Sequence, residues 1–369
     1  MWKYQQPGEV IFGKGALKNL QAILEEKGYK KPLLLTDEVL LKIGVVDKVK
    51  EDSGVDFVGV MSDIEPNPTV HNVTAGINMA LETKADVIIA VGGGSVIDCG
   101  KAVRVAAFAG WTFEELFATN DFPGALPMIA VPTTAGTGAE VTPVALISWH
   151  EKNMKHMLKS PILFPTIALV DPSLTYSAPK SVTAISGIDV LAHALDSLGN
   201  VNATPVTASL AVSAAKLAFA NLLDAWKDGT NLEARDNMAQ ASTIAGLAFS
   251  QTSTSGAHAC SYSLTAKFNV PHGEACAFTL DSWVKANAKV APQMDVYAKE
   301  IGFNNANEMA DALSQLKKDL GLRTTLSEIG VSVDDLDYLA EQAMGAGNMM
   351  NSLAQIGHEG IKEIYLSKQ

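Results

Sequence analysis

The sequence has few cysteines and few basic side chains. Three cysteines, Cys99, Cys260 and Cys276, occur among 369 residues. An odd and sparse set fits a reducing compartment better than a disulfide framework. Because they lack C-x-x-C spacing, Cys260 and Cys276 are interpreted as small buried residues rather than metal ligands. Lys and Arg number 28 against 40 Asp and Glu, a net charge of −12. Such a surface repels polyphosphate, so we expect no nucleic-acid partner.

Long apolar runs are also missing. No stretch reaches about 18 uninterrupted apolar residues, the length that predicts a membrane-spanning helix. Residues 1–7 have no apolar core of the signal-peptide kind. We therefore expect a cytoplasmic protein with no membrane partner. The 47% hydrophobic content over 369 residues is enough for two domains or one unusually large one.

The two halves of the chain have different patterns. The first half alternates short β-branched runs with helical segments, which is typical of a parallel sheet covered by helices. The expected strands are residues 32–37, 57–60, 86–91 and 128–131. Later segments are rich in Ala and Leu at helical spacing, at residues 182–198, 205–226, 232–249, 306–319, 333–345 and 351–365. We predict an α/β domain over residues 1–180 and an all-helical domain over residues 181–369.

A glycine-rich turn follows one of the predicted buried strands. Gly92, Gly93, Gly94 and Ser95 lead from that strand into a helical segment. Consecutive glycines let the backbone approach a phosphate closely, and the first amides of a helix attract an anion. The pattern is neither G-x-G-x-x-G nor a P-loop, so a tight turn without a ligand remains an alternative.

Two further polar features support a cofactor site at the ends of the strands. Residues 132–142 follow the strand at 128–131 and contain Thr133, Thr134 and Thr137. Hydroxyl groups and glycines at a strand's carboxyl end suit a cofactor crevice in an open α/β sheet. Asp37 could accept hydrogen bonds from ribose hydroxyls and repel a 2′-phosphate, which favours NAD over NADP. A plain polar loop and a solvated Asp are the alternatives, but two such turns after two strands favour the cofactor.

The helical half contains a candidate metal site. Asp189 and His193 are four residues apart in a helical segment, so they share one face. Such a pair alone is more often a surface contact. His258 and His272 follow, fourteen residues apart, the second in a Pro-His-Gly turn. One carboxylate and three imidazoles suit Fe(II) or Zn(II) with an open position for a substrate.

In combination, these motifs resemble those of the iron-containing (group III) alcohol dehydrogenases over nearly the whole chain. The matching segments are residues 92–98, 132–142, 171–175, 187–189, 193–194, 258 and 271–273. The resemblance implies an α/β dinucleotide-binding domain followed by an all-α metal-binding domain, an architecture similar to that of dehydroquinate synthase. It also implies a homodimer or larger homo-oligomer.

The same resemblance implies which residues bind the metal and the dinucleotide. The implied ligands of Fe(II) or Zn(II) are Asp189, His193, His258 and His272. The implied contacts to NAD(H) are Asp37, Gly92, Gly93, Gly94, Ser95, Asp98, Thr133, Thr134, Thr137 and Lys155. The activity implied is hydride transfer between the nicotinamide and a small aldehyde or alcohol, with the metal polarising the substrate oxygen.

Two departures from the family pattern bear on the site. Many members carry a histidine four residues after the first of the later metal histidines, and here that position is Tyr262. A phenol could still donate to the nascent alkoxide, so Tyr262 and His258 are the candidate catalytic residues. Residues 347–351 replace a segment in which many members have Asn-Pro-Arg, which puts any role of that arginine in doubt.

The substrate is the most open part of the prediction. Residues 261–265 are similar to a subgroup that reduces two-carbon anionic aldehydes, sulfoacetaldehyde to isethionate or phosphonoacetaldehyde to 2-hydroxyethylphosphonate. Lys267 or Arg104 could then bind the anion. One alternative is a reductase of uncharged short-chain aldehydes or diols, of the lactaldehyde, butanol or glycerol type. Another, from a different class, is a non-catalytic nucleotide-binding protein of the same fold.

Overall fold

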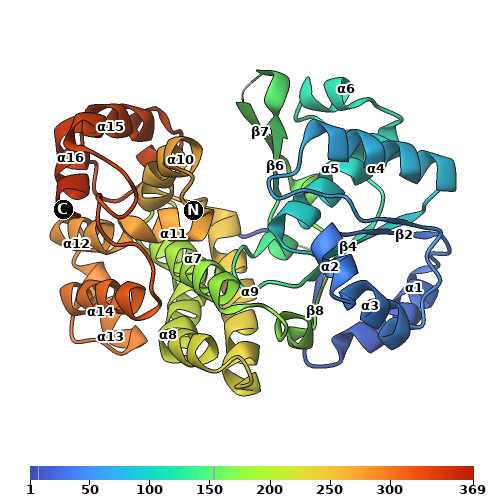
Figure 1. The fold of residues 1–369 in the computed structure, drawn as a ribbon, viewed down its shortest axis with the longest axis horizontal. Coiled ribbons are helices and arrows are strands. Elements are labelled where there is room, and N and C mark those ends of the chain that lie inside the picture. Colours follow the sequence, from blue (N-terminus) through green and yellow to red (C-terminus); the bar gives the residue numbers. More distant parts are fainter. Residues whose placement is uncertain (7, 153) are drawn as a thin grey trace. The chain divides into compact units, whose positions relative to one another are not determined.

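The computed structural model describes residues 1–6, 8–152 and 154–369. These residues form two compact units, and the predicted order of an α/β part before an all-helical part is confirmed (Figure 1). The sheet unit consists of Gln6–Thr134 and Gly138–Tyr176. The helical unit consists of Met1–Gln5, Ala135–Thr137 and Ser177–Gln369. The predicted division at residue 180 placed Met1–Gln5 and Ala135–Thr137 in the α/β domain, whereas they belong to the helical unit.

The sheet unit is built on six parallel strands in the order β1-β8-β5-β4-β2-β3. Their bounds are β1 Glu9–Phe12, β2 Pro32–Leu35, β3 Gly59–Met61, β4 Val87–Gly92, β5 Met128–Pro132 and β8 Ile167–Val170. Every residue of β2, β4, β5 and β8 is buried, as expected when helices cover both faces of a parallel sheet. The four strands predicted from the sequence are confirmed, whereas β1 and β8 were missed.

Side chains alternate between two cores on opposite faces of the sheet. Leu33 and Leu35 of β2 pack in the core under α4 Val70–Thr83 and α5 Gly94–Ala109, while Leu34 packs in the core under α1 Leu20–Lys27 and α3 Val45–Ser53. Figure 1 shows these helix pairs on the two faces. Two shorter helices lie beside them, α2 Glu38–Lys42 against α3 and α6 Phe113–Phe117 against α4 and α5. Full burial of each such side chain contributes about 1.5–3 kcal/mol.

An antiparallel hairpin, which the sequence analysis missed, projects from the sheet unit. It pairs β6 Val144–Trp149 with β7 Met154–Lys159. Fully buried Lys101 of α5 anchors it, because its Nζ donates to the Val144 carbonyl oxygen at 2.7 Å and to Thr142 Oγ1 at 3.0 Å. An ammonium group in a core needs such acceptors.

The helical unit contains ten α-helices within the part of the chain that the structure describes. They are α7 Lys180–Leu198, α8 Pro205–Lys227, α9 Leu232–Thr252, α10 Gly256–Phe268, α11 His272–Phe278, α12 Leu280–Val290, α13 Gln293–Ile301, α14 Ala306–Asp319, α15 Leu336–Gly345 and α16 His358–Leu366. The predicted helices near α7, α8, α9, α14 and α15 are confirmed. The last begins at His358, not at residue 351.

Helix α8 is the one described helix that is long and apolar enough to cross a membrane by length and composition. It packs against α7 and α9 in Figure 1, and 44% of its most apolar window is buried. Its buried face consists largely of alanines, among them Ala211, Ala214 and Ala215. Such small side chains let neighbouring helices approach closely, so α8 is a core helix of this unit.

A buried ion cluster holds the end of the chain. Asp281 of α12 accepts from Lys317 Nζ at 2.7 Å and from Lys368 Nζ at 2.7 and 2.6 Å. Lys317 also donates to the carbonyl oxygens of Ala277 and Phe278. Burial lowers the pKa of Lys317 to about 8. The buried ammonium group of Lys317 therefore depends on the carboxylate of Asp281, which it shares with Lys368.

The first prediction concerns this cluster. Asp281→Asn should lower the free energy of unfolding of the helical unit by about 3–5 kcal/mol, because it leaves two buried ammonium groups without a counter-charge. Denaturant unfolding followed by circular dichroism measures the change. Asp311→Asn, which breaks the exposed 2.7 Å pair with Lys285, is the control and should cost at most about 1 kcal/mol. Equal shifts in the two variants would contradict the prediction.

Candidate active site

The glycine-rich turn lies where the sequence predicted it, between β4 and α5. A Cβ at Gly92 would lie 2.5 Å from Val96 Cγ2, whereas one at Gly93 would meet Thr134 Oγ1 at 3.5 Å. Gly92 is therefore required for packing, and Gly93 adjoins the second polar turn. Gly93 is the N-cap of α5, and among the described residues no side chain caps this end. The first amides of a sixteen-residue helix thus remain available to an anion.

Three of the predicted cofactor segments follow neighbouring strands. Asp37 follows β2, Gly92 ends β4, and Thr133 and Thr134 follow β5. Since the sheet order places β5, β4 and β2 side by side, their carboxyl ends form one row, the usual place of a ligand in an open α/β sheet. Asp37 also caps α2, because its Oδ1 accepts from Leu40 N at 2.8 Å.

Two of the other predicted cofactor residues have structural partners, and a third is in the other unit. Asp98 Oδ2 accepts from Leu146 N at 3.0 Å, and Oδ1 lies 3.4 Å from Lys101 Nζ. Burial raises the pKa of Asp98, and Lys101 opposes this rise. Asp98 thus joins α5 to the hairpin. Lys155 donates to Asn67, and desolvation lowers the pKa of Lys155. Thr137 belongs to the helical unit.

Asn67, which the sequence analysis missed, lies next to the predicted dinucleotide contacts of the sheet unit. Its Oδ1 accepts from Lys155 Nζ at 2.9 Å, and its backbone N–H donates to Ser95 Oγ at 3.1 Å. It has a left-handed backbone, with φ 58°, a conformation that Asn tolerates better than most residues. The Pro-Asn-Pro sequence around it was the available signal. Asn67 therefore couples two predicted dinucleotide contacts.

In the helical unit, three helices carry the predicted metal ligands. Asp189 and His193 lie on α7, His258 lies on α10, and His272 is the first residue of α11. Helix α11 packs directly on α7, since a Cβ at Gly273 would lie 2.1 Å from the carbonyl oxygen of Ile185 and 2.9 Å from Asp189 Cβ. Only glycine permits this approach, which brings the histidine turn next to the carboxylate.

The structure brings all four predicted ligands together. Asp189 Oδ1 lies 3.9 Å from His258 Nε2, and Asp189 Oδ2 lies 3.9 Å from His193 Nδ1. The ring of His258 lies 4.9 Å from that of His193 and 5.8 Å from that of His272, measured between centroids. The ring of Phe249 stacks on the ring of His193, with their centroids 4.1 Å apart. A role of these side chains as ligands remains a prediction.

Unsatisfied atoms in this cluster fit a cation. Asp189 and His258 are each 3% exposed. Asp189 Oδ1 and His258 Nε2 have no hydrogen-bond partner among the described residues. An unsatisfied buried polar atom costs about 1–3 kcal/mol, and a metal ion between these two atoms would satisfy both. Burial raises the pKa of Asp189 to about 7, so the carboxylate needs a nearby positive charge to remain ionised at neutral pH.

Two of the histidines are held by a second layer of acceptors. His258 Nδ1 lies 2.7 Å from Asp196 Oδ2, and His193 Nδ1 lies 3.3 Å from the Gly136 carbonyl oxygen. A proton on each Nδ1 leaves Nε2 as a lone-pair donor, the usual arrangement for metal-bound histidines. The sequence analysis missed Asp196, although it lies seven residues after Asp189 on the same helix.

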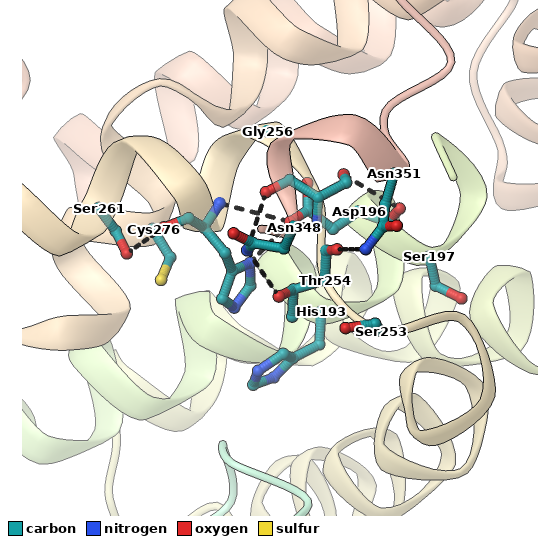
Figure 2. Close-up of polar contacts among 12 residues, drawn as sticks. His193, Asp196, Ser197, Ser253, Thr254, Gly256, Ser261, Cys276, Asn348 and Asn351 are labelled. Carbon is teal, nitrogen blue, oxygen red and sulfur yellow. Dashed lines mark hydrogen bonds and ion pairs between the residues drawn. The ribbon is translucent and has the colours of Figure 1, made fainter. Parts of the chain in front are cut away.

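The start of α10 is fixed by the segment that departs from the family pattern. Asn348 Nδ2 donates to Thr254 Oγ1 at 3.0 Å, and Asn351 Nδ2 donates to the Thr254 carbonyl oxygen at 2.9 Å (Figure 2). Gly256 N donates to Ser352 Oγ at 2.8 Å. In place of an arginine, this segment supplies polar side chains that hold the helix bearing His258.

Cys276 is buried, as interpreted from the sequence. Its sulfur belongs to a cluster with Asp189, His258 and His272 in which the donor atoms lie within 4.8 Å of one another. One expectation about the surroundings needs correction. Arg104 is wrong as an anion-binding group, because its buried guanidinium donates to the carbonyl oxygens of Leu126, Ile162 and Phe164.

The other two groups considered for substrate binding, Lys267 and Tyr262, are more exposed than Arg104. Lys267 Nζ, 2.7 Å from Asp335 Oδ1, takes part in an exposed ion pair. Tyr262 lies one helical turn after His258 and is 46% exposed.

Comparison with known proteins identifies the family. A family model described as iron-containing alcohol dehydrogenase matches residues 7–172, and the C-terminal model of the same family matches residues 183–368. The chain belongs to the iron-containing alcohol dehydrogenase family. The enzyme is therefore an oxidoreductase that acts on CH–OH groups, and a non-catalytic protein of the same fold is the wrong alternative.

Relatives and a solved structure that are similar to this enzyme align with more than nine-tenths of the chain. The 1,3-propanediol dehydrogenase of Citrobacter freundii is 34% identical, with 99% of this chain and 98% of the relative covered. The sulfoacetaldehyde reductase of Bilophila wadsworthia is 31% identical, with 93% and 92% covered. Among solved structures, the sulfoacetaldehyde reductase of Bifidobacterium kashiwanohense in complex with NAD+ has a TM-score of 0.95 and 34% identity, with 100% of this chain and 98% of that chain covered.

The second prediction tests the acceptor behind His258. Asp196→Asn removes the charge that orients the imidazole, so it should weaken Zn(II) binding about 10–100-fold. Competition with a chromophoric chelator measures the affinity. Asp334→Asn, an exposed change in the same unit, should leave the affinity unchanged. Wild-type affinity in Asp196→Asn would show that the 2.7 Å contact does not position a ligand.

Proposed function

We propose that this enzyme is a metal-dependent, NAD(H)-linked aldehyde reductase that works reversibly as an alcohol dehydrogenase. The proposal rests on the two unpaired buried atoms, Asp189 Oδ1 and His258 Nε2, which lie 3.9 Å apart. With His193 and His272 beside them, these side chains would hold Fe(II) or Zn(II). The bound metal would act as a Lewis acid toward the substrate oxygen.

The sheet unit supports NAD(H) as the hydride carrier. The uncapped start of α5 suits the pyrophosphate, and Asp37 at the end of the adjacent strand suits ribose hydroxyls more than a 2′-phosphate. Asn67 would hold Ser95 and Lys155 ready for the dinucleotide. Orientation of the nicotinamide is the protein's contribution to hydride transfer. The NAD+ complex of the similar sulfoacetaldehyde reductase supports the same choice.

In this proposal Tyr262 donates a hydrogen bond to the substrate oxygen as it gains charge. Its position one turn after His258, together with its 46% exposure, leaves the side chain accessible to a small molecule. Burial raises the pKa of Tyr262 above its ordinary value of about 10, so the phenol remains protonated at neutral pH and remains a donor. His258 would contribute to catalysis by holding the metal.

The third prediction concerns this hydroxyl. Tyr262→Phe should lower kcat for aldehyde reduction about 100-fold, the low end of the usual effect of a proton donor. Because burial raises the pKa of Tyr262 above its ordinary value, the loss should stay nearly constant from pH 6 to 10. Steady-state kinetics from pH 6 to 10 measure both. Tyr338→Phe, another part-exposed tyrosine of the helical unit, serves as the control. If kcat, KM and pH profile in Tyr262→Phe match those of wild type, the role is removed.

We propose a two-carbon anionic aldehyde, sulfoacetaldehyde or phosphonoacetaldehyde, as the substrate class. Support comes from the hydroxyl-rich residues 261–265 and from the two relatives named sulfoacetaldehyde reductase. An uncharged aldehyde or diol is the second candidate, favoured by the similarity to 1,3-propanediol dehydrogenase. Cytoplasmic location, a homodimer or larger assembly, and the lack of a nucleic-acid or membrane partner remain predictions.

The fourth prediction separates these candidates. With protein loaded with Fe(II) or Zn(II), kcat/KM with NADH should be at least about 100-fold higher for sulfoacetaldehyde or phosphonoacetaldehyde than for propanal, because a site built for a charged group leaves donors unpaired without it. NADPH should be the poorer reductant. Chelation should abolish turnover, and metal should restore it. Equal or better turnover of propanal would favour the uncharged class.

A further inference from the structure

The two departures from the family pattern, Tyr262 and the segment at residues 347–351, both contact one side chain, that of Thr254. Burial raises the pKa of Tyr262, and a side-chain hydrogen bond from Thr254 opposes this rise. A hydrogen bond lowers the pKa of a phenol when it is donated to the oxygen, because it then favours the ionised form. Thr254 is therefore the donor in this bond, and the oxygen of Tyr262 is the acceptor.

Helix geometry explains how these two residues, eight positions apart, reach each other. Side chains of an α-helix lean toward its N-terminus, so the phenol of Tyr262 reaches back over the first turns of α10. Thr254 lies immediately before Ser255, the N-cap of that helix. A hydroxyl group at the start of α10 thus faces the phenol from the N-terminal side.

Asn348 fixes the hydroxyl group of Thr254. Its Nδ2 donates to Thr254 Oγ1 at 3.0 Å, as Figure 2 shows, and to the Ser255 carbonyl oxygen at 3.3 Å. A carbonyl oxygen can only accept, so the amide nitrogen of Asn348 must face these two atoms. Thr254 Oγ1 thus accepts from Asn348 and keeps its own proton for the oxygen of Tyr262.

Two unfavourable features show that Thr254 is held in place by its surroundings. Asn348 Oδ1 is buried and has no hydrogen-bond partner in the described part of the chain. Ser253, directly before Thr254, has φ 64° and ψ 179°, a backbone conformation that is essentially restricted to glycine. Asn351 also anchors the segment, since its Nδ2 donates to the Thr254 carbonyl oxygen at 2.9 Å. Strain of this kind clusters at functional sites.

We infer that Thr254, held by Asn348, is a positioning residue for Tyr262, an inference that rests on the role proposed above for that tyrosine. Because Thr254 occupies one lone pair of the phenol oxygen, the Tyr262 proton points away from Thr254 and toward the substrate oxygen.

The hydrogen bond also acts after the proton has moved. During aldehyde reduction, NADH supplies the hydride, the O–H bond of Tyr262 breaks, and its proton forms the O–H bond of the alcohol. The phenolate that remains still accepts the hydrogen bond from Thr254, and a bond to a charged oxygen is stronger than one to a neutral oxygen. Solvent then returns a proton to Tyr262.

The fifth prediction is a double-mutant cycle on the full-length enzyme loaded with Zn(II) or Fe(II), assayed with NADH and sulfoacetaldehyde or propanal. Thr254→Val keeps the shape of the side chain without the hydroxyl group. It should lower kcat about tenfold, the effect of one hydrogen bond, and should change KM by less than about twofold. In Tyr262→Phe protein the same substitution should not lower kcat further, because the acceptor is already gone. Thr254→Ser, which retains the hydroxyl group, should keep most of the activity.

The outcomes distinguish this inference from the role of Tyr262 on which it rests. Wild-type kcat in Thr254→Val, or an equal loss in both backgrounds, would overturn the positioning role and leave the role of Tyr262 standing. Wild-type kcat in Tyr262→Phe would overturn both. If Thr254→Val does not fold by circular dichroism, Asn348→Ala takes its place in the cycle, and its loss of kcat should likewise vanish in Tyr262→Phe protein.

Discussion

The helical unit depends on keeping one carboxylate, that of Asp189, in a nearly dry interior. Desolvation of this group is so unfavourable that burial raises its pKa to about 7, and a buried charge persists in a core only with compensating partners. Those partners come from α10 and α11, which pack on α7 and bring imidazole nitrogens beside it. The packing of α10 and α11 on α7 therefore sets the surroundings of the carboxylate.

Support for the cluster comes from far along the chain. Asp196 and the Gly136 carbonyl oxygen fix two rings, and Asn348 and Asn351 hold the loop from which α10 begins. Each contact is a hydrogen bond between partly or fully buried groups, where a lost partner costs more than it would in water. The geometry around the carboxylate is therefore determined by residues that do not touch it.

Features that depend on the local residue pattern could be predicted from the sequence. Contacts that depend on which helices pack together could not. Buried strands, glycine turns and the i, i+4 pair of Asp189 and His193 are readable from periodicity, because strand and helix spacing fix which side chains share a face. The role of Asp196 could not be read in this way, since it depends on α10, which brings His258 Nδ1 to 2.7 Å from Asp196 Oδ2. The prediction that Arg104 binds an anion was wrong because the sequence does not distinguish an exposed guanidinium from a buried one that donates to carbonyl oxygens.

The glycine at position 273 links packing to coordination. Its missing side chain lets the backbone of α11 rest against α7, with 2.1 Å between an added Cβ and the carbonyl oxygen of Ile185. The distance between α7 and α11 therefore also determines how far apart the donor atoms of Asp189 and His272 lie. Substitution of the ligands alone could not make room for a larger ion between α7 and α11. The two helices would also have to move apart, and the side chains packed around them would have to change.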